Sequence, residues 1–383
     1  TKKKDEEMFL EEGSEPAKKP TLKQILRTTF VNTNSEFVKE NAWLKDIGYD
    51  IRNCAVDEFL TAMNASITQL KNGEINHFKM SFRSKKKMKS ESFYLRKRWI
   101  KQSKNTTERD EIGCVSGFIL KLPNAKPVAP WAGKQCFQDE ILMDCRLQRT
   151  KSGHLYLCIP QALSVKRVDN QDPSNSKKPL KVCSLDPGVR TFQTIFDPNE
   201  GCAYQVAPND INRIVRLCLS LDCIISRQSK ERSRMKFRLK RVERRIRLKI
   251  RNLVAEVHKQ LAKHLSTHYD LILIPKFETS QMVKKGSRNI GSKSVRQMLC
   301  WSHFRFRERL LFKCREYGSN VAVVDESWTS KTCSGCGLLD HNLGSKKVYW
   351  CRGCGLTIDR DVNGAKNILL KNFKALDLVF ETD

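Results

Sequence analysis

The spacing of apolar side chains changes twice along the chain, which predicts three regions. Between residues 22 and 72 apolar positions recur at about the helical period of 3.6 residues. The apolar residues that define the last of these helices are Ile51, Ala55, Phe59, Ala62 and Ile67. Asp50 precedes them and is expected to cap that helix, because its carboxylate can accept from free backbone N–H groups. Residues 1–21 are rich in charge, Gly and Pro, so we expect a flexible tail there.

Between residues 77 and 178 the apolar runs are short and separated by turn residues, which predicts β-strands. The expected strands lie within 92–95, 117–122, 141–147 and 154–159. Thr150–Gly153 has the composition of a hairpin turn. Several short strands of this kind are typical of a small β-barrel.

Beyond Pro179, buried strands alternate with long helices. Leu180–Phe192 predicts a strand, a carboxylate at Asp186, a tight turn and a second strand. Two long helices are expected between residues 209 and 268, and one amphipathic helix over 294–317. Further buried strands are expected at 271–275 and 321–326. The fold class is therefore α+β and multidomain, with an α/β domain in the C-terminal half.

Two Cys-x-x-Cys-Gly sequences occur in this last region. The pairs are Cys333/Cys336 and Cys351/Cys354. Four thiolates in two such turns are the ligand set of a closed, tetrahedral Zn²⁺ site that supports structure. The alternatives are two disulfides, which a reducing compartment disfavours, or Cys pairs that hold no metal. We therefore predict a zinc ribbon over residues 331–356.

The charge balance is strongly basic. The chain has 71 Lys and Arg against 42 Asp and Glu, a formal net charge of +29. This surplus predicts a polyanionic partner, either nucleic acid or an anionic membrane. No apolar run in the sequence is long enough to cross a bilayer, which favours nucleic acid and no membrane partner.

Basic residues gather in two places. In the strand region they alternate with aromatic residues, which suits phosphate contact and base stacking, although a solvated charge run is the alternative. In the helical stretch 227–251 they could lie along a nucleic-acid backbone. The residues expected to contact nucleic acid are Lys85, Lys86, Lys87, Arg96, Arg98, Arg232, Arg234, Lys236, Arg238, Lys240, Arg241 and Arg245.

Two acidic residues stand at the ends of predicted elements. Asp186 follows the first strand of the α/β domain, and Asp361 begins the last helix. Capping of that helix is the simpler interpretation of Asp361. With a third carboxylate between them, these residues would form a two-metal site, because Mg²⁺ prefers oxygen ligands and two such ions assist phosphodiester cleavage.

Three motifs together resemble a known family. Leu185–Arg190, Thr329–Cys333 and Asp359–Ala365 are similar to the split RuvC nuclease of TnpB proteins, which are transposon-encoded, RNA-guided DNA endonucleases. The resemblance implies an RNase H-like (RuvC) fold and Mg²⁺-dependent cleavage beside a short flanking motif. It also implies a guide RNA of the ωRNA type, a double-stranded DNA target and a monomer bound to its RNA. Asp186 and Asp361 match the first and third catalytic carboxylates.

The middle carboxylate departs from the TnpB pattern. That family places a Glu at the end of the strand that closes here with Pro275, which cannot bind a metal. The departure resembles the eukaryotic Fanzor proteins, and it implies a rearranged site in a nuclear protein. Glu326 and Glu278 could each supply the ligand. We favour Glu326, since a strand end holds a ligand more rigidly than a loop.

The resemblance also suggests domain boundaries. A helical recognition region would occupy residues 22–76, and a β-barrel wedge domain residues 77–178. A RuvC-like nuclease domain would comprise residues 179–330, with a helical insertion at 209–268, and resume at 357–383 after the zinc ribbon. Two other functions fit the same motifs. Pro275 is compatible with a nuclease-dead, RNA-guided DNA-binding protein, and the cysteines with a zinc-ribbon nucleic-acid adaptor.

Overall fold

The computed structural model places the described residues in two compact units, 1–161 and 162–383. The described residues are 20–81, 91–102, 118–120, 141–150, 153–166, 180–286, 288, 290–341, 343–344 and 346–380. The predicted tail up to residue 19 and the predicted contacts Lys85, Lys86 and Lys87 lie outside these ranges.

The first unit begins with helices, as the apolar period predicts. They are α1 (Leu22–Phe30), α2 (Glu36–Glu40), the 3₁₀ turn η1 (Ala42–Asp46) and α3 (Tyr49–Lys71). The expected cap at Asp50 is wrong, because α3 already begins at Tyr49 and Gly48 is its N-cap. Asp50 is buried in the first turn and pairs with Arg96 and Arg98 instead. The buried carboxylate therefore joins α3 to the strand region.

Short antiparallel strands complete this unit. β1 (Glu91–Leu95), β4 (Cys145–Arg149) and β5 (Leu155–Cys158) form one sheet in the order β1-β4-β5. β2 (Ile100–Gln102), after the 3₁₀ turn η2 (Lys97–Trp99), pairs with β3 (Phe118–Leu120). Leu95, Leu120, Ile141 and Cys145 form a small core between them. The predicted barrel involves residues outside the described ranges and stays a prediction.

A five-stranded mixed sheet organises the second unit. Its strands are β6 (Val182–Pro187), β7 (Gln193–Asp197), β8 (Cys202–Val206), β9 (Leu271–Pro275) and β10 (Asn320–Val324). Their order is β10-β9-β6-β7-β8, with β6, β9 and β10 parallel and β7 and β8 antiparallel. All five residues of β9 are buried, since the strand is covered on both faces, and this explains its uninterrupted apolar sequence.

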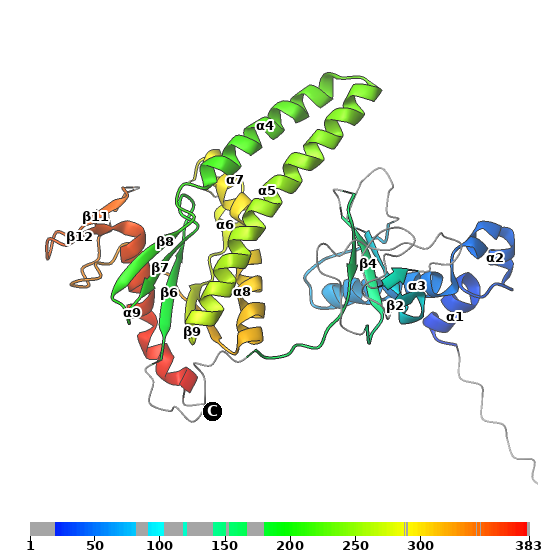
Figure 1. Cartoon of the computed structure of the whole chain (residues 1–383), viewed down its shortest axis with the longest axis horizontal. Helices are drawn as coiled ribbons and strands as arrows, with labels where there is room; N and C mark the ends of the chain where they lie inside the picture. Colours follow the sequence, from blue (N-terminus) through cyan, green and yellow to red (C-terminus); the bar gives the residue numbers. More distant parts are fainter. Residues whose placement is uncertain are drawn as a thin grey trace, which may run out of the picture. The chain divides into compact units, whose positions relative to one another are not determined.

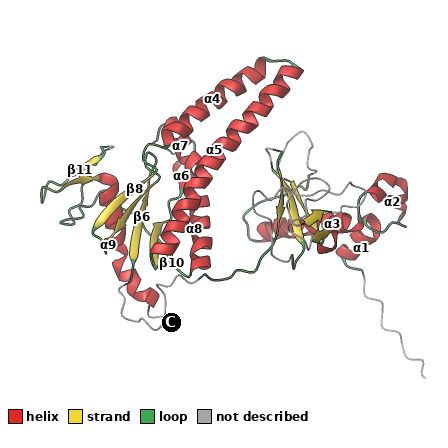
Figure 2. Cartoon of the chain, viewed as in Figure 1, coloured by secondary structure: helices red, strands yellow, loops and turns green. Residues whose placement is uncertain are grey.

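Helices cover both faces of this sheet (Figures 1 and 2). On one face, α5 (Ser233–His268) and α8 (His303–Tyr317) pack with Leu185, Phe192 and Ile272 in the largest core. On the other face, α9 (Arg360–Phe380) packs Ile368 and Leu369 against β9. The remaining elements are α4 (Ile211–Lys230), α6 (Thr279–Met282), α7 (Ser292–Trp301), β11 (Val348–Trp350) and β12 (Thr357–Asp359). Figure 1 shows α4 and α5 as a long helical hairpin.

Two predicted elements differ in the structure. The single helix expected over 294–317 is broken at Ser302, which adopts a left-handed backbone with φ of 52°. The break lets Trp301 turn fully into the core, where its Nε1 donates to the Val189 carbonyl oxygen at 2.9 Å. β10 ends at Val324, so Glu326 lies two residues beyond the strand rather than within it.

None of the helices in the described ranges combines the length and the apolar character needed to cross a bilayer.

Candidate functional site

The parallel strands β6, β9 and β10 end at one edge of the sheet, and three acidic residues lie there or follow. Val324, the last residue of β10, pairs with Pro275, the last residue of β9. Asp186 is the penultimate residue of β6, and Glu326 follows β10. Asp361 belongs to the first turn of α9, which packs against β6. The fold thus brings together three residues, the first and last of which are 175 positions apart in the sequence.

Asp186 lies directly against α9. Side chains alternate along β6, so that Leu185 faces α5 and α8 while its neighbours Ser184 and Asp186 face α9. Ser184 Oγ donates to the Ala365 carbonyl oxygen at 2.7 Å. A Cβ atom at Gly364 would lie only 2.6 Å from Asp186 Oδ2. A glycine at this position therefore allows the helix backbone to touch the carboxylate.

Asp361 and Glu326 act electrostatically on Asp186. Burial is the main reason that the pKa of Asp186 lies well above its usual value, followed by the carboxylates of Asp361 and Glu326. The pKa values of Asp361 and Glu326 are also raised, mainly by burial. Arg360 opposes part of the effect on Asp186. The charges of Asp361 and Glu326 thus reach Asp186 at the sheet edge.

Asp359 performs the capping role that was the alternative for Asp361. Asp359 Oδ1 accepts from the Asp361 backbone N–H at 2.9 Å, directly before the first turn of α9. Lys347 lies 3.7 Å from the other Asp359 oxygen. Since Asp359 satisfies this backbone group, the Asp361 carboxylate remains free for another role.

Glu326 and Glu278 differ in their surroundings, although both line a cavity of about 510 Å³. Glu278 is exposed and forms an ion pair with Lys276 at 2.6 Å. Glu326 is half-buried and contributes to the raised pKa of Asp186. Asp325 is exposed and tied to Lys371 at 2.5 Å, so it does not compete for this position. The electrostatic coupling supports Glu326 as the middle carboxylate.

The donor chemistry of Asp186, Asp361 and Glu326 fits divalent cations. Oxygen ligands are what Mg²⁺ prefers, and a half-buried group of carboxylates needs a counter-charge. Among the described residues, only the four cysteines bring three or more ligand atoms within 4.8 Å of one another. The ligand oxygens of Asp186, Asp361 and Glu326 therefore do not all lie within that distance of one another.

The cysteine pairs of the ribbon form a compact ligand set. Cys333, Cys336, Cys351 and Cys354 are free thiols, and their Sγ atoms all lie within 4.8 Å of one another. The Sγ atoms of Cys333 and Cys354 are 3.6 Å apart, and those of Cys336 and Cys351 are 3.5 Å apart. These distances exceed a disulfide bond and approach the roughly 3.8 Å that a tetrahedral site with Zn–S bonds of about 2.3 Å requires.

The same backbone turn recurs at both pairs. The N–H of Gly337 donates to the carbonyl of Cys333, and that of Gly355 to the carbonyl of Cys351. Both glycines have positive φ, which few other residues adopt without strain. Backbone hydrogen bonds, first from Cys354, lower the pKa of Cys351 to about 6. The ribbon thus stabilises a thiolate, the form in which cysteine binds metal.

Two asparagines of α9 fasten the ribbon to the acidic edge. Asn363 accepts from the Ser334 N–H at 2.9 Å and donates to the Thr332 carbonyl at 2.7 Å. Asn367, one turn further, donates to the carbonyls of Thr329 and Thr332 at 2.8 and 2.6 Å. One helix therefore carries both Asp361 and the support of the first cysteine turn.

The predicted nucleic-acid contacts fall into two groups. Arg96 pairs with Asp144 at 2.8 Å, and Arg98 pairs with Asp50, so both guanidinium groups are engaged within the first unit. The predicted contacts on α5 and its N-cap are all exposed, and none forms an ion pair with a described carboxylate: Arg232, Arg234, Lys236, Arg238, Lys240, Arg241 and Arg245. The helical group is therefore the better placed for phosphates.

Sequence reasoning missed the residues that position the carboxylates. Gly364, Asn363 and Asn367 all follow Asp361 in the last helix, where the sequence motif predicts a role for the carboxylate alone. A glycine in the first turn of a helix was the available signal, because it costs helix stability and usually has a packing reason.

Similar proteins place the chain in a family. Residues 303–368 match the family model described as Cas12f1-like, TNB domain. A putative transposase, A625R, of Paramecium bursaria Chlorella virus 1 is 30% identical over 341 residues, 88% of this chain and 73% of that protein. The TnpB-like protein L79 of Acanthamoeba polyphaga mimivirus is 32% identical over 215 residues, 55% of this chain and 41% of that protein.

A shorter match is bacterial. A putative RNA-guided DNA endonuclease of Streptomyces pristinaespiralis is 39% identical over 70 residues, 18% of this chain and 17% of that protein. The chain thus spans less than half of the mimivirus protein but most of the chlorella virus protein. On the extent of the chlorella virus match, this chain belongs to the family of TnpB-like proteins and putative transposases of giant viruses, which fits the resemblance to Fanzor proteins.

Proposed function

We propose that the chain is an RNA-guided DNA endonuclease with a RuvC-type, RNase H-like catalytic domain. The observation that carries the proposal is the meeting of Asp186, Asp361 and Glu326 at one sheet edge in a TnpB-like chain. A bacterial protein that is similar to 70 residues of this chain is named a putative RNA-guided DNA endonuclease. A bare nucleic-acid adaptor would not need two carboxylates that raise the pKa of a third at the same sheet edge.

Each part of the second unit then has a role. The three carboxylates would hold divalent cations, for which we propose Mg²⁺, and such ions would supply charge stabilisation and water activation for phosphodiester cleavage. The half-buried edge limits water around the reacting phosphate. The Cys₄ ribbon, taken to hold Zn²⁺, and Asn363 keep α9 and Asp361 in place. The exposed basic face of α5 contacts nucleic-acid backbones.

The partners follow from this activity. A guide RNA would read the target by base pairing, while the protein would read the shape of the heteroduplex and a short flanking motif. We place the chain in the nucleus, as a monomer with its RNA and a double-stranded DNA target.

The test is cleavage of DNA by protein loaded with the RNA that co-purifies from native cells. Asp186→Ala and Asp361→Ala should each reduce cleavage more than about 100-fold, because even outer partners of a metal are worth about 10- to 100-fold. RNA and target binding should be nearly unchanged, since neither residue contacts a backbone phosphate directly in this proposal.

The middle carboxylate is resolved by a matched pair of isosteric variants. Glu326→Gln should be as inactive as Asp186→Ala, while Glu278→Gln should keep activity. The opposite pattern would assign the role to Glu278. Retained cleavage in both variants would refute a site of three carboxylates, and an inactive wild-type protein that still binds target DNA would favour the nuclease-dead alternative.

A further inference from the structure

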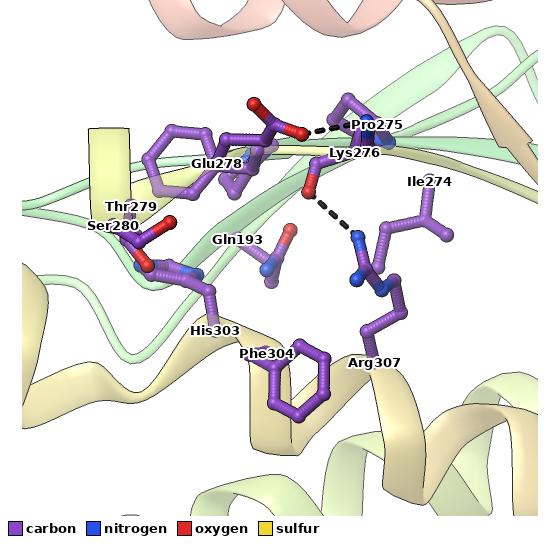
Figure 3. A pocket seen from close by; sticks show the side chains of 12 residues that line it. Gln193, Ile274, Pro275, Lys276, Glu278, Thr279, Ser280, His303, Phe304 and Arg307 are labelled. Carbon is purple, nitrogen blue, oxygen red and sulfur yellow. Dashed lines mark hydrogen bonds and ion pairs between the residues drawn. The ribbon is translucent and has the colours of Figure 1, made fainter. Parts of the chain in front are cut away.

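A second cavity opens at the same edge of the sheet, on the face of the sheet that α8 covers (Figure 3). Its volume is about 310 Å³, at the lower end of the range for small-ligand pockets. Pro187, Ile274 and Pro275 contribute from the strand ends, and His303, Phe304 and Arg307 from α8. The segment 276–280, which runs from the end of β9 into the first residues of α6, forms the remaining wall. The cavity thus has room for one nucleobase.

Gln193 is an unsatisfied amide in the wall of this cavity. The residue pairs with Pro187 across β6 and β7, and it is 0% exposed. Neither Nε2 nor Oε1 has a hydrogen-bond partner among the described residues. Figure 3 shows the amide in the middle of the lining side chains. A buried, unpaired amide costs stability, so its retention points to a ligand that offers both a donor and an acceptor.

Aromatic rings stand beside the amide. Phe304 is 59% exposed, so its ring is accessible to a ligand, and Phe277 packs edge-on against His303 with ring centroids 4.7 Å apart. Phe277 has a φ of 36°, a strained backbone for a bulky residue. Backbone strain of this kind clusters at active and ligand-binding sites, where the surrounding structure holds the residue in place. Exposed and strained rings beside an amide suit stacking of a base.

Cationic groups lie at the mouth of the cavity. Arg307 donates from Nη1 to the Lys276 carbonyl oxygen at 2.7 Å. The Lys276 ammonium pairs with Glu278 at 2.6 Å, and both side chains are largely exposed. A cavity with an amide inside, aromatic rings beside it and cations at its mouth matches the parts of a nucleotide.

The cavity and the carboxylates lie on opposite faces of one strand end. Asp186 faces α9, and the next residue, Pro187, faces the cavity. Lys276, Phe277 and Glu278 line both this cavity and the one that Glu326 lines. A strand whose phosphate lies at the carboxylates could therefore pass over the sheet edge and place a neighbouring base in the cavity.

Resting on the proposed nuclease function, we propose that this cavity binds one unpaired base of the DNA strand being cut. Gln193 would hydrogen-bond the base edge, as glutamine does with adenine. Phe304 and Phe277 would stack on the base, and Arg307 would face its phosphate. Single-stranded DNA loses little by extruding a base, because no pair has to be broken.

The test uses full-length Asp186→Ala protein with its co-purified RNA, so that DNA is bound but not cut. Short single-stranded DNA oligonucleotides are compared with copies that carry one abasic nucleotide at each position in turn. An abasic nucleotide at one particular position should weaken binding about tenfold, the scale of base stacking on an aromatic residue. Phe304→Ala, a surface change, and Gln193→Leu should each remove that position dependence. Binding of oligoribonucleotides of the same sequence should not depend on the position of the abasic nucleotide.

Thermal unfolding separates a binding role of Gln193 from a structural one. Leucine has a similar shape and no unpaired polar atoms, so Gln193→Leu should melt at a higher temperature than the parent while losing the base dependence. Equal binding of intact and abasic DNA would overturn the pocket but leave the nuclease proposal standing. Position dependence that survives both substitutions, or appears with RNA instead, would also overturn it. Absence of any DNA binding would refute both proposals.

Discussion

Gly364 decides how closely the last helix can approach the first strand of the sheet. It lies one turn beyond Asp361, and its missing side chain leaves space for the Asp186 carboxylate. That carboxylate therefore lies beside the N-terminal turn of α9, where the backbone partial charges favour an anion. At the scale of residues, the acidic site depends on a glycine as much as on its acids.

Gly364→Ala should displace Asp186 and abolish DNA cleavage. The new Cβ would lie 2.6 Å from Oδ2, so the carboxylate or the helix must move, at a cost of about 1–3 kcal/mol. Cleavage and thermal unfolding would be measured together. Gly344→Ala is the matched control, because no heavy atom lies within 4 Å of its added Cβ. Full activity in Gly364→Ala would show that the close contact is unimportant.

Asp186→Asn should stabilise the protein in buffer without divalent cations. The folded-state pKa of Asp186 is raised above its unfolded value by burial and by Asp361 and Glu326, so ionisation in the folded state costs free energy. Below the unfolded value, near pH 4, both states are protonated and the variant gains nothing. The gain in unfolding temperature should grow as pH rises above that value. A gain that is independent of pH would contradict the argument.

At the scale of elements, α9 is the shared support of the acidic edge and the ribbon. Asp361 and Gly364 lie in its first turns, and Asn363 and Asn367 bind the backbone before and within the first cysteine turn. Neither the sheet edge nor the ribbon alone fixes Asp361. The ribbon therefore reaches the acidic edge through its hydrogen bonds to α9.

One zinc ion per chain is expected from metal analysis of the purified protein, because four thiols converge. Cys351→Ser should lose the ion and reduce cleavage, since α9 loses its fixed partner. Cys223→Ser is a suitable control, because that thiol is exposed on α4 and far along the chain from the ribbon. A folded, active and zinc-free Cys351→Ser protein would refute the structural role.

Asn367→Leu should loosen the ribbon while keeping all four cysteines. The change removes two hydrogen bonds and leaves the Thr329 carbonyl short of a donor, a cost of about 1–3 kcal/mol, while the Thr332 carbonyl keeps the bond from Asn363. Zinc transfer to a coloured chelator should be faster than in the parent. Leu370→Ala, an exposed change on the same helix, should leave the transfer rate unaltered. Equal rates in all three proteins would show that the asparagine does not hold the ribbon.

The elements that could be predicted from sequence are those whose period reflects burial. β9 was found to the residue because both its faces are covered and its run is wholly apolar. The break at Ser302 could not be found, since the apolar period continues through it and the cause is Trp301 turning into a distant core. Gly364 escaped for the same reason, because its neighbour Asp186 lies far away in the sequence.

At the scale of the whole chain, the dominant property is a formal charge of +29. Much of the exposed surplus lies on the N-cap and the first half of α5, where seven predicted contacts have no ion pair with a described carboxylate. Such a surface attracts any polyanion, while base pairing between guide RNA and target would supply the sequence specificity. The protein would thus supply much of the affinity for nucleic acid, and the guide RNA the specificity for the target sequence.

Reversal of three charges on α5 should weaken nucleic-acid binding and its dependence on salt. Each lost phosphate contact lowers the slope of log K against log salt by about 0.7–0.9. Arg238→Glu, Lys240→Glu and Arg241→Glu would be combined, and RNA affinity measured across salt concentrations. Lys39→Glu, Lys45→Glu and Lys71→Glu change the net charge equally on exposed positions of the first unit. The same loss in both triple variants would show that only net charge matters.

The shared support provided by α9 also has a thermodynamic consequence. If zinc at the cysteines favours the position of Asp361 that binds divalent cations, the coupling must be equal in both directions. Occupied carboxylates would then raise the affinity of the ribbon for zinc by the same factor by which zinc raises theirs. The two kinds of metal would be mutual effectors within one chain, so that a shortage of zinc weakens magnesium binding before the protein unfolds.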